Sequence, residues 1–256
     1  MDDEKVKAIV KRNFDESAEK YAIFEEKYHF FKTLTGELSR FCGLTEGMSV
    51  LDVGCGTGAS TFYLYEEVHC REVVGIDISE RMISQAMRHL NPHLRFICGD
   101  AERLSDFVCG AFDAILYNAT IFILPNPAKS LRSAKPMLKD GGVCGASYLS
   151  GIFSSGVDIL EEARRQGVCG DGRVVTSERI EQSFHEVFGD YELKSIDIPV
   201  SRELIEEFHL IPAQSASLFP RRAYSERITL VRTLFSEFKK RYSGFKMRWN
   251  VIKATG

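Results

Sequence analysis

Three apolar runs of this chain each end in an aspartate, and closely spaced glycines follow the first of them. The acids are Asp52, Asp77 and Asp100, and the glycines are Gly54, Gly56 and Gly58. Glycine allows a positive φ and lets main chain approach a ligand where a Cβ would block it. A carboxylate two residues before the first glycine would repel a pyrophosphate, but it suits a ligand with an ammonium or sulfonium group. The stretch therefore predicts a loop that holds a cationic ligand against main chain.

The second and third acids can supply acceptors to a nucleoside. Asp77 can accept two hydrogen bonds from ribose hydroxyls, and Ile78 can cover one face of an adenine. Asp100 can accept from the adenine amine, and the main-chain N–H of Ala101 is available to a ring nitrogen. Each acid has an alternative role as a local cap or turn former. Three acids at three consecutive strand ends are harder to explain in that way, and together they indicate an adenosyl group with a positively charged tail.

Strands and helices are expected to alternate around these acids. The expected strands are 50–53, 72–77, 95–98, 112–117 and 143–147, and the expected helices between them are 59–67, 79–90 and 127–138. This alternation predicts a doubly wound, mostly parallel α/β sheet, in which ligands bind at the carboxyl ends of the strands. Asn118 follows the fourth strand and joins the acids at that edge. Residues 247–254 read as a final strand, paired antiparallel.

Three further regions flank or interrupt this core. Residues 1–42 carry an aromatic stripe at helical spacing and are expected to form an N-terminal helical lid, with Tyr21 at the ligand site. The core is expected to span 43–200 and 244–256. Residues 201–243 are aromatic and helical in character, which predicts a helical cap inserted before the last strand.

Five segments resemble, in order and spacing, the motifs of class I S-adenosylmethionine-dependent methyltransferases. They are 50–58, 74–79, 99–104, 112–120 and 138–142. The resemblance implies a seven-stranded Rossmann-like sheet whose last strand is antiparallel. It also implies that the glycine loop, with Cys55, contacts the methionine moiety of the cofactor, Asp77 the ribose and Asp100 the adenine. Residues 14–21 are similar to a segment of quinone-biosynthesis and malonyl-carrier O-methyltransferases in which an aromatic helix covers the cofactor.

The expected activity is methyl transfer from S-adenosylmethionine to a small, hydrophobic acceptor by in-line displacement. His29 and His209 are the candidates for a general base, although packing is an equally ordinary role for either. Two alternatives stay open. One is a non-catalytic protein that binds the cofactor or regulates a partner, and the other is a nicotinamide-dependent oxidoreductase, which Asp52 disfavours.

Composition narrows the function classes further. The 256 residues carry a formal net charge of -3, which gives no general attraction to nucleic acid. The seven cysteines show no Cys-x-x-Cys pair, so we expect reduced packing residues, no metal site and a cytoplasmic protein. No apolar run reaches the roughly 20 residues of a membrane span. The basic residues of 239–248 are expected to be a solvated face, with a site for an acidic carrier or partner as the alternative.

Overall fold

The computed structural model describes residues 2–88, 91–172 and 174–256. The chain divides into two compact units. The first comprises Met1–Tyr148, Val174–Lys194 and Val251–Gly256, and the second comprises Leu149–Arg173 and Ser195–Asn250. This division differs from the expected one, because the N-terminal helices belong to the first unit and the second unit is larger than 201–243.

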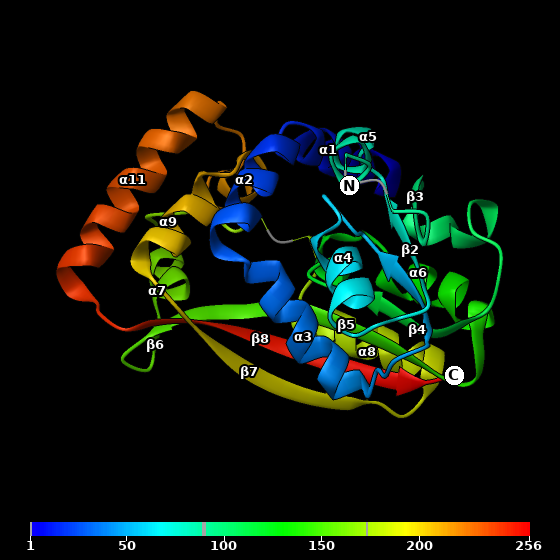
Figure 1. Cartoon of the computed structure of the whole chain (residues 1–256). Helices are drawn as coiled ribbons and strands as arrows, with labels where there is room; N and C mark the ends of the chain where they lie inside the picture. The colour runs from blue at the N-terminus through cyan, green and yellow to red at the C-terminus, as the bar shows by residue number, and fades with distance from the viewer. Residues whose placement is uncertain (1, 89–90, 173) are drawn as a thin grey trace. The chain divides into compact units, whose positions relative to one another are not determined.

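The centre of the fold is one mixed sheet of mostly parallel strands, as expected, with the last strands antiparallel (Figure 1). Its strands follow the order β3-β2-β1-β4-β5-β8-β7, and β6 pairs with β5 off this path. They are β1 (Ser49–Val53), β2 (Glu72–Asp77), β3 (Leu94–Cys98), β4 (Phe112–Tyr117), β5 (Leu138–Ser154), β6 (Val157–Asp158), β7 (Glu192–Val200) and β8 (Phe245–Thr255). The tips of β1, β2, β3 and β4 share one edge because these strands pair in parallel. The predicted site residues therefore meet at that edge.

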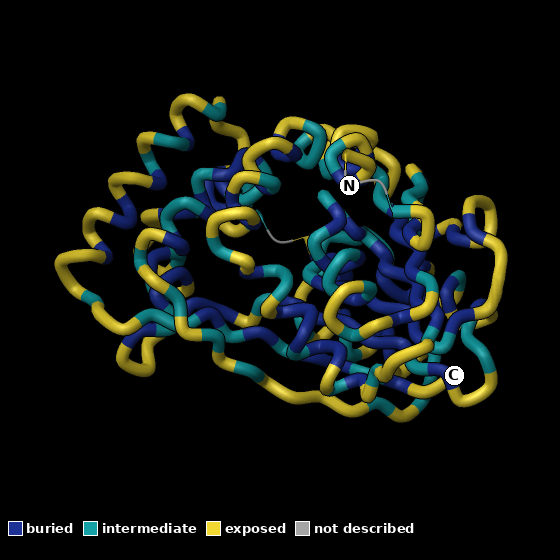
Figure 2. Tube along the Cα trace, in the orientation of Figure 1, coloured by how far each residue is buried: buried dark blue, intermediate teal, exposed yellow. Residues whose placement is uncertain are grey.

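Alternate residues of the buried strands serve the two faces of the sheet. Leu51 and Val53 pack in a core cluster with Leu131 of α6 (Pro127–Ala134) and Phe184 of α8 (Ser177–Phe188). Asp52, between them in sequence, meets α4 (Ala59–Glu66) on the other face. Within the first unit, the buried residues concentrate along these strands (Figure 2). The acid therefore lies in a buried layer and not on an open surface.

The N-terminal segment forms three helices, α1 (Asp3–Asp15), α2 (Ala18–Tyr28) and α3 (Phe30–Cys42). The break between α1 and α2 falls at residues 16–17. A second break at His29, whose φ is 50°, was not predicted. The buried carboxylate of Glu25 accepts hydrogen bonds from Phe31 N and Lys32 N, both at 2.9 Å, and so caps α3 across this break. Its pKa is raised by burial.

Several element bounds differ from expectation for local reasons. Pro136 ends the regular helix before β5, so α6 stops at Ala134 and a 3-10 turn follows. α5 (Glu80–Ala86) ends before the expected residue 90, and residues 89–90 of that expectation lie outside the described part. β5 continues to Ser154 because β6 pairs back on it. The remaining helices are α7 (Ile159–Arg165), α9 (Arg202–Leu210), α10 (Pro212–Leu218) and α11 (Tyr224–Arg241).

Candidate functional site

The glycine loop connects β1 to α4 and is held by the tip of β2. Gly54 N and Cys55 N both donate to Ile76 O, at 2.7 and 3.1 Å. A Cβ at Gly54 would lie 2.2 Å from Thr120 Cγ2, so only glycine fits there. At Gly56, whose φ is 55°, a Cβ would meet nothing within 4 Å. The loop thus leaves open space beside its central glycine, as a ligand cradle requires.

Asp52 is fully buried behind this loop, and only one of its oxygens has a partner. Oδ2 accepts from Ser60 Oγ at 2.5 Å and from Thr61 Oγ1 at 2.7 Å, both in the first turn of α4. Oδ1 is buried without a hydrogen-bond partner among the described residues. Burial raises the pKa of Asp52 to about 6, against the two hydroxyls, and the nearby charge of Asp77 adds to the rise. The site therefore carries a buried acceptor that a cationic ligand would satisfy.

Asp77 is half-buried at the tip of β2 and links the glycine loop to the start of α5. Its Oδ2 accepts from Gly56 N at 3.0 Å and its Oδ1 from Ser79 N at 2.8 Å. Burial raises the pKa of Asp77 to about 6 in spite of these two N–H donors. Each carboxylate oxygen has a second acceptor site, so both oxygens can still receive ribose hydroxyls. Ser79 caps α5 through its own hydroxyl, which accepts from Met82 N at 3.1 Å.

Asp100, after β3, is bound by a lysine that the sequence analysis did not identify. Lys7 Nζ lies 2.8 Å from Asp100 Oδ2 and 2.9 Å from Glu102 Oε2, and the Lys7 side chain is only 7% exposed. Burial alone would lower the pKa of Lys7, but the hydrogen bonds to Asp100, Glu102 and Glu4 raise it above its usual value. Asp100 Oδ1 accepts from Glu102 N at 2.9 Å. The predicted adenine acceptor is thus tied to α1.

Asn118, predicted as a cofactor contact, directs its side chain to protein partners. Its Nδ2 donates to Thr35 Oγ1 at 2.9 Å, and its Oδ1 accepts from Ser147 Oγ at 2.8 Å. The side-chain amide therefore links α3, β4 and β5, and a contact of Asn118 with the cofactor stays a prediction. The main-chain carbonyl of Asn118, unlike its side chain, lies beside the glycine loop. Thr120 Oγ1 reaches Asn118 O at 3.1 Å and Gly54 O at 3.2 Å, so these two carbonyls converge on one hydroxyl.

The other predicted residues have contrasting surroundings. Tyr21 is buried and stacks on Phe14, with ring centroids 5.8 Å apart. His29 is exposed between α2 and α3. His209, in the second unit, is 2% exposed, and its Nδ1 lies 2.7 Å from the carbonyl of Ile205 in its own helix.

Burial lowers the pKa of His209 to about 4. The surroundings of His209 are typical of a packing residue, and a role as general base stays a prediction. Ile78 and Ala101, the two predicted adenine contacts, are both half-buried and follow Asp77 and Asp100 in sequence.

Sequence reasoning missed several residues that build the site. Ser60 and Thr61 carried a usable signal, because paired hydroxyls in the first turn after a glycine loop can reach back to an acid on the preceding strand. Thr120 and Ser147 gave none, since a lone hydroxyl in an apolar strand or turn has many ordinary roles. Lys7 gave none either, because it belongs to a charged helix 93 residues before its partner Asp100.

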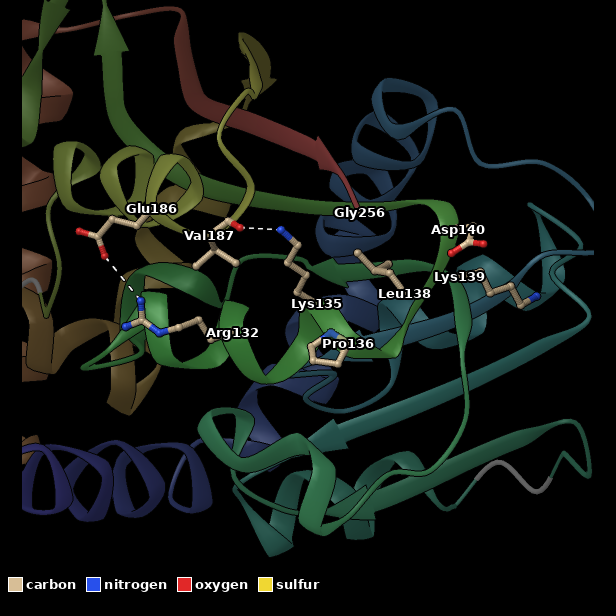
Figure 3. Close-up of a pocket in the computed structure, with 9 residues that line it drawn as sticks. All are labelled: Arg132, Lys135, Pro136, Leu138, Lys139, Asp140, Glu186, Val187 and Gly256. Carbon is tan, nitrogen blue, oxygen red and sulfur yellow. Dashed lines mark hydrogen bonds and ion pairs between the residues drawn. The ribbon is translucent and has the colours of Figure 1, made fainter.

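A cavity of about 600 Å³ lies elsewhere in the first unit, where β5 begins and β8 ends (Figure 3). Because β1, β4 and β5 are parallel, this is the edge opposite the glycine loop. Its cations already have partners: Arg132 pairs with Glu186 at 3.8 Å, and Lys135 Nζ donates to Val187 O at 2.8 Å. The cavity is therefore separate from the site formed by the three acids.

Among residues 2–88, 91–172 and 174–256, no group of three or more His, Cys, Asp or Glu side chains is placed to hold a metal ion. Within the same ranges, no helix combines the length and the apolar character needed to cross a membrane.

Comparison with known proteins adds independent findings. Residues 50–142 match the family model described as a methyltransferase domain. Trans-aconitate 2-methyltransferase of Deinococcus radiodurans is 33% identical over 122 residues, which cover 46% of this chain and 46% of that protein. The malonyl-[acyl-carrier protein] O-methyltransferase of Halalkalibacterium halodurans is 28% identical over 54% of this chain and 53% of its own length. The chain thus spans about half the length of these curated relatives.

Solved structures share the fold at low identity. The [4+2]-cyclase SpnF has a TM-score of 0.55 at 19% identity, and covers 87% of this chain and 81% of its own. Phosphoethanolamine N-methyltransferase 2 of Haemonchus contortus, in complex with phosphomonomethylethanolamine and S-adenosylhomocysteine, has a TM-score of 0.55 at 18% identity over 87% of this chain and 52% of its own. These likenesses support the fold alone. The family match is confined to residues 50–142, and it shows that this part of the chain is similar to a methyltransferase domain.

Proposed function

We propose that this protein transfers a methyl group from S-adenosylmethionine to a small acceptor. The observation that carries the proposal is the orphan acceptor Asp52 Oδ1 behind the glycine loop. A buried carboxylate oxygen without a donor is costly, and an ammonium-bearing ligand nearby would offset that cost. The carbonyls of Gly54 and Asn118 converge on the Thr120 hydroxyl, and each keeps a second acceptor site that would be available to the same cationic group.

The chain's own residues would hold the cofactor at three points. The loop around Gly56 and the two carbonyls would hold the methionine end, Asp77 the ribose and Asp100 the adenine. The bound cofactor supplies a methyl group already activated by its sulfonium. The protein's task is then to align the acceptor with that methyl group and to exclude water. A thiol, amine or carboxylate acceptor can be methylated without a strong base in the site, whereas a phenol or enol would need one.

Helix α1 supports the proposed lid over the adenosyl end. Lys7 joins α1 to Asp100 at the tip of β3, and Asp15 Oδ1 accepts from Ser79 Oγ at 2.7 Å, just after the tip of β2. These attachment points are eight residues apart, about 12 Å along the helix axis. The helix therefore crosses both strand tips at which the nucleoside is expected, and we propose that it must loosen for cofactor exchange.

The acceptor is proposed to be small and hydrophobic. The support is the aromatic content of the helical regions, in which half-buried Phe31 contacts Tyr21 and Phe24. The names of the relatives point to acceptors of varied chemistry, among them an acid and a carrier-bound malonyl group. An acidic carrier at the basic residues of 239–248 gains no support, because Lys246 and Arg248 both pair with Asp197.

A non-catalytic or non-methylating role is the second candidate, because a protein described as a cyclase shares this fold. The experiment that tests the proposal has two parts. Calorimetry with S-adenosylmethionine and S-adenosylhomocysteine tests binding, and transfer of a radiolabelled methyl group to a panel of carboxylic acids, phenols, quinols and thiols tests turnover. Binding with transfer to any acceptor supports the proposal. Binding with no transfer to any of them favours the second candidate.

A further inference from the structure

Ser147 on β5 holds the turn that follows β4 by two hydrogen bonds. Its Oγ donates to Asn118 Oδ1 and accepts from Ala119 N, each at 2.8 Å. The Ser147 side chain is fully buried. A hydroxyl has one proton to give and two lone pairs, so this arrangement uses its donor and one of its acceptor sites on adjacent residues of one turn.

The residue held in this way has an unusual backbone conformation. Ala119 has a φ of 54°, in the left-handed region that residues with a Cβ rarely adopt. Such a residue persists only where its surroundings compensate for the strain. Here the Ala119 N–H is fixed by Ser147, while Asn118 on one side is fixed through its amide to Thr35.

The strained turn borders the glycine loop directly. Thr120, next in sequence, donates to Gly54 O and lies so close to Gly54 that a Cβ there would clash with its side chain. The backbone conformation of this turn therefore determines where the carbonyl oxygens of Asn118 and Gly54 come together at the Thr120 hydroxyl.

We propose that Ser147 is a positioning residue for the cofactor, and that it acts by keeping Ala119 in the left-handed conformation so that the two carbonyls face the methionine ammonium. The inference rests on the proposed function. Without the hydroxyl, Ala119 would relax toward a negative φ, and the carbonyl of Asn118 would turn away from that of Gly54. Ser147 itself touches the turn and not the ligand.

A pair of substitutions separates positioning from a merely structural role. Ser147→Ala should weaken S-adenosylhomocysteine binding about tenfold, the factor that matches the cost of a left-handed alanine. Ala119→Gly, which removes that cost, should restore most of the affinity when it is combined with Ser147→Ala. Ser183→Ala is the matched control, because Ser183 is an equally buried serine whose hydroxyl donates to Arg179 O within α8. It should leave the affinity unchanged.

Calorimetry on the wild type, the three single variants and the double variant decides the question. Loss of affinity in Ser147→Ala that Ala119→Gly fails to recover would overturn the inference, and so would unchanged affinity in Ser147→Ala. If the wild type itself binds no S-adenosylhomocysteine, the proposed function fails. Urea unfolding of the same variants still tests the coupling of Ser147 and Ala119, since additive changes in stability would contradict it.

Discussion

Replacing Asp52 by asparagine should stabilise the cofactor-free protein at high pH and weaken cofactor binding. The buried carboxyl has a pKa of about 6, raised from 3.8. Asp52 therefore binds a proton more tightly in the folded protein than in the unfolded chain. Its contribution to stability is least favourable once the pH has risen above the folded-state pKa of about 6. At pH 8 the ionised group costs about 3 kcal/mol, and at pH 5 about 1.5 kcal/mol, by proton linkage.

Asparagine does not titrate, so it adds no pH dependence to the free energy of unfolding. The measurable quantity is the difference in that free energy between Asp52→Asn and wild type. The part of the amide that takes the place of Oδ1 would be buried without a hydrogen-bond partner, which would cost about 1 kcal/mol at every pH. The stability of Asp52→Asn relative to wild type should therefore rise by about 1.4 kcal/mol from pH 5 to pH 8. Urea unfolding of the cofactor-free protein at the two pH values measures it.

The same variant should lose about 1.5 to 3 kcal/mol of S-adenosylmethionine binding at pH 8, because a charged acceptor is removed. Calorimetry on the two proteins measures this loss. A stability difference between the two proteins that does not change with pH would contradict the claim that Asp52 is buried with a raised pKa. Unchanged affinity would refute its role toward the cation.

Three further variants test other parts of the account. Asp77→Ala should weaken cofactor binding by about 1 to 3 kcal/mol through lost charged hydrogen bonds, and calorimetry showing no loss would contradict the ribose assignment. Lys7→Met should destabilise the protein by about 3 kcal/mol and speed S-adenosylhomocysteine dissociation in stopped-flow, whereas exposed Lys5→Met on the same helix should do neither. Equal behaviour of the two variants would contradict the proposal that the Lys7–Asp100 pair holds α1 over the adenosyl end. Asp113→Asn should lower stability above pH 5, with the loss fading toward pH 2. The hydrogen bond from Lys139 lowers the pKa of Asp113 to about 2, so its contribution disappears as the pH falls from about 4 to about 2. A loss in urea unfolding that persists at pH 2 would contradict that assignment.

The sheet could be predicted because its signals are local. β2 and β4 have the predicted bounds, and β1 and β3 each begin one residue earlier than predicted. Each run carries its own apolar residues and ends in its own acid or turn, so no distant contact is needed to recognise it. The long extension of β5 was not predictable in this way, because it depends on pairing with β6 and on the second unit.

The site was predicted in part, and the reason is again the range of the interactions. The three acids and the glycine loop lie where the sequence placed them. Their partners do not follow from sequence: Lys7 reaches Asp100 from 93 positions away, and Ser147 reaches Asn118 from 29 positions away. The Asn118 amide bonds to Thr35 and Ser147, and no local sequence pattern reveals these two partners.

The central claim is that the acidic edge of the sheet binds an adenosyl group with a cationic tail. Calorimetry of the wild-type protein with S-adenosylmethionine, S-adenosylhomocysteine and NADH tests it most directly. The account predicts that both sulfur compounds bind with one-to-one stoichiometry and that NADH does not. Binding of NADH, or of none of the three, would contradict it.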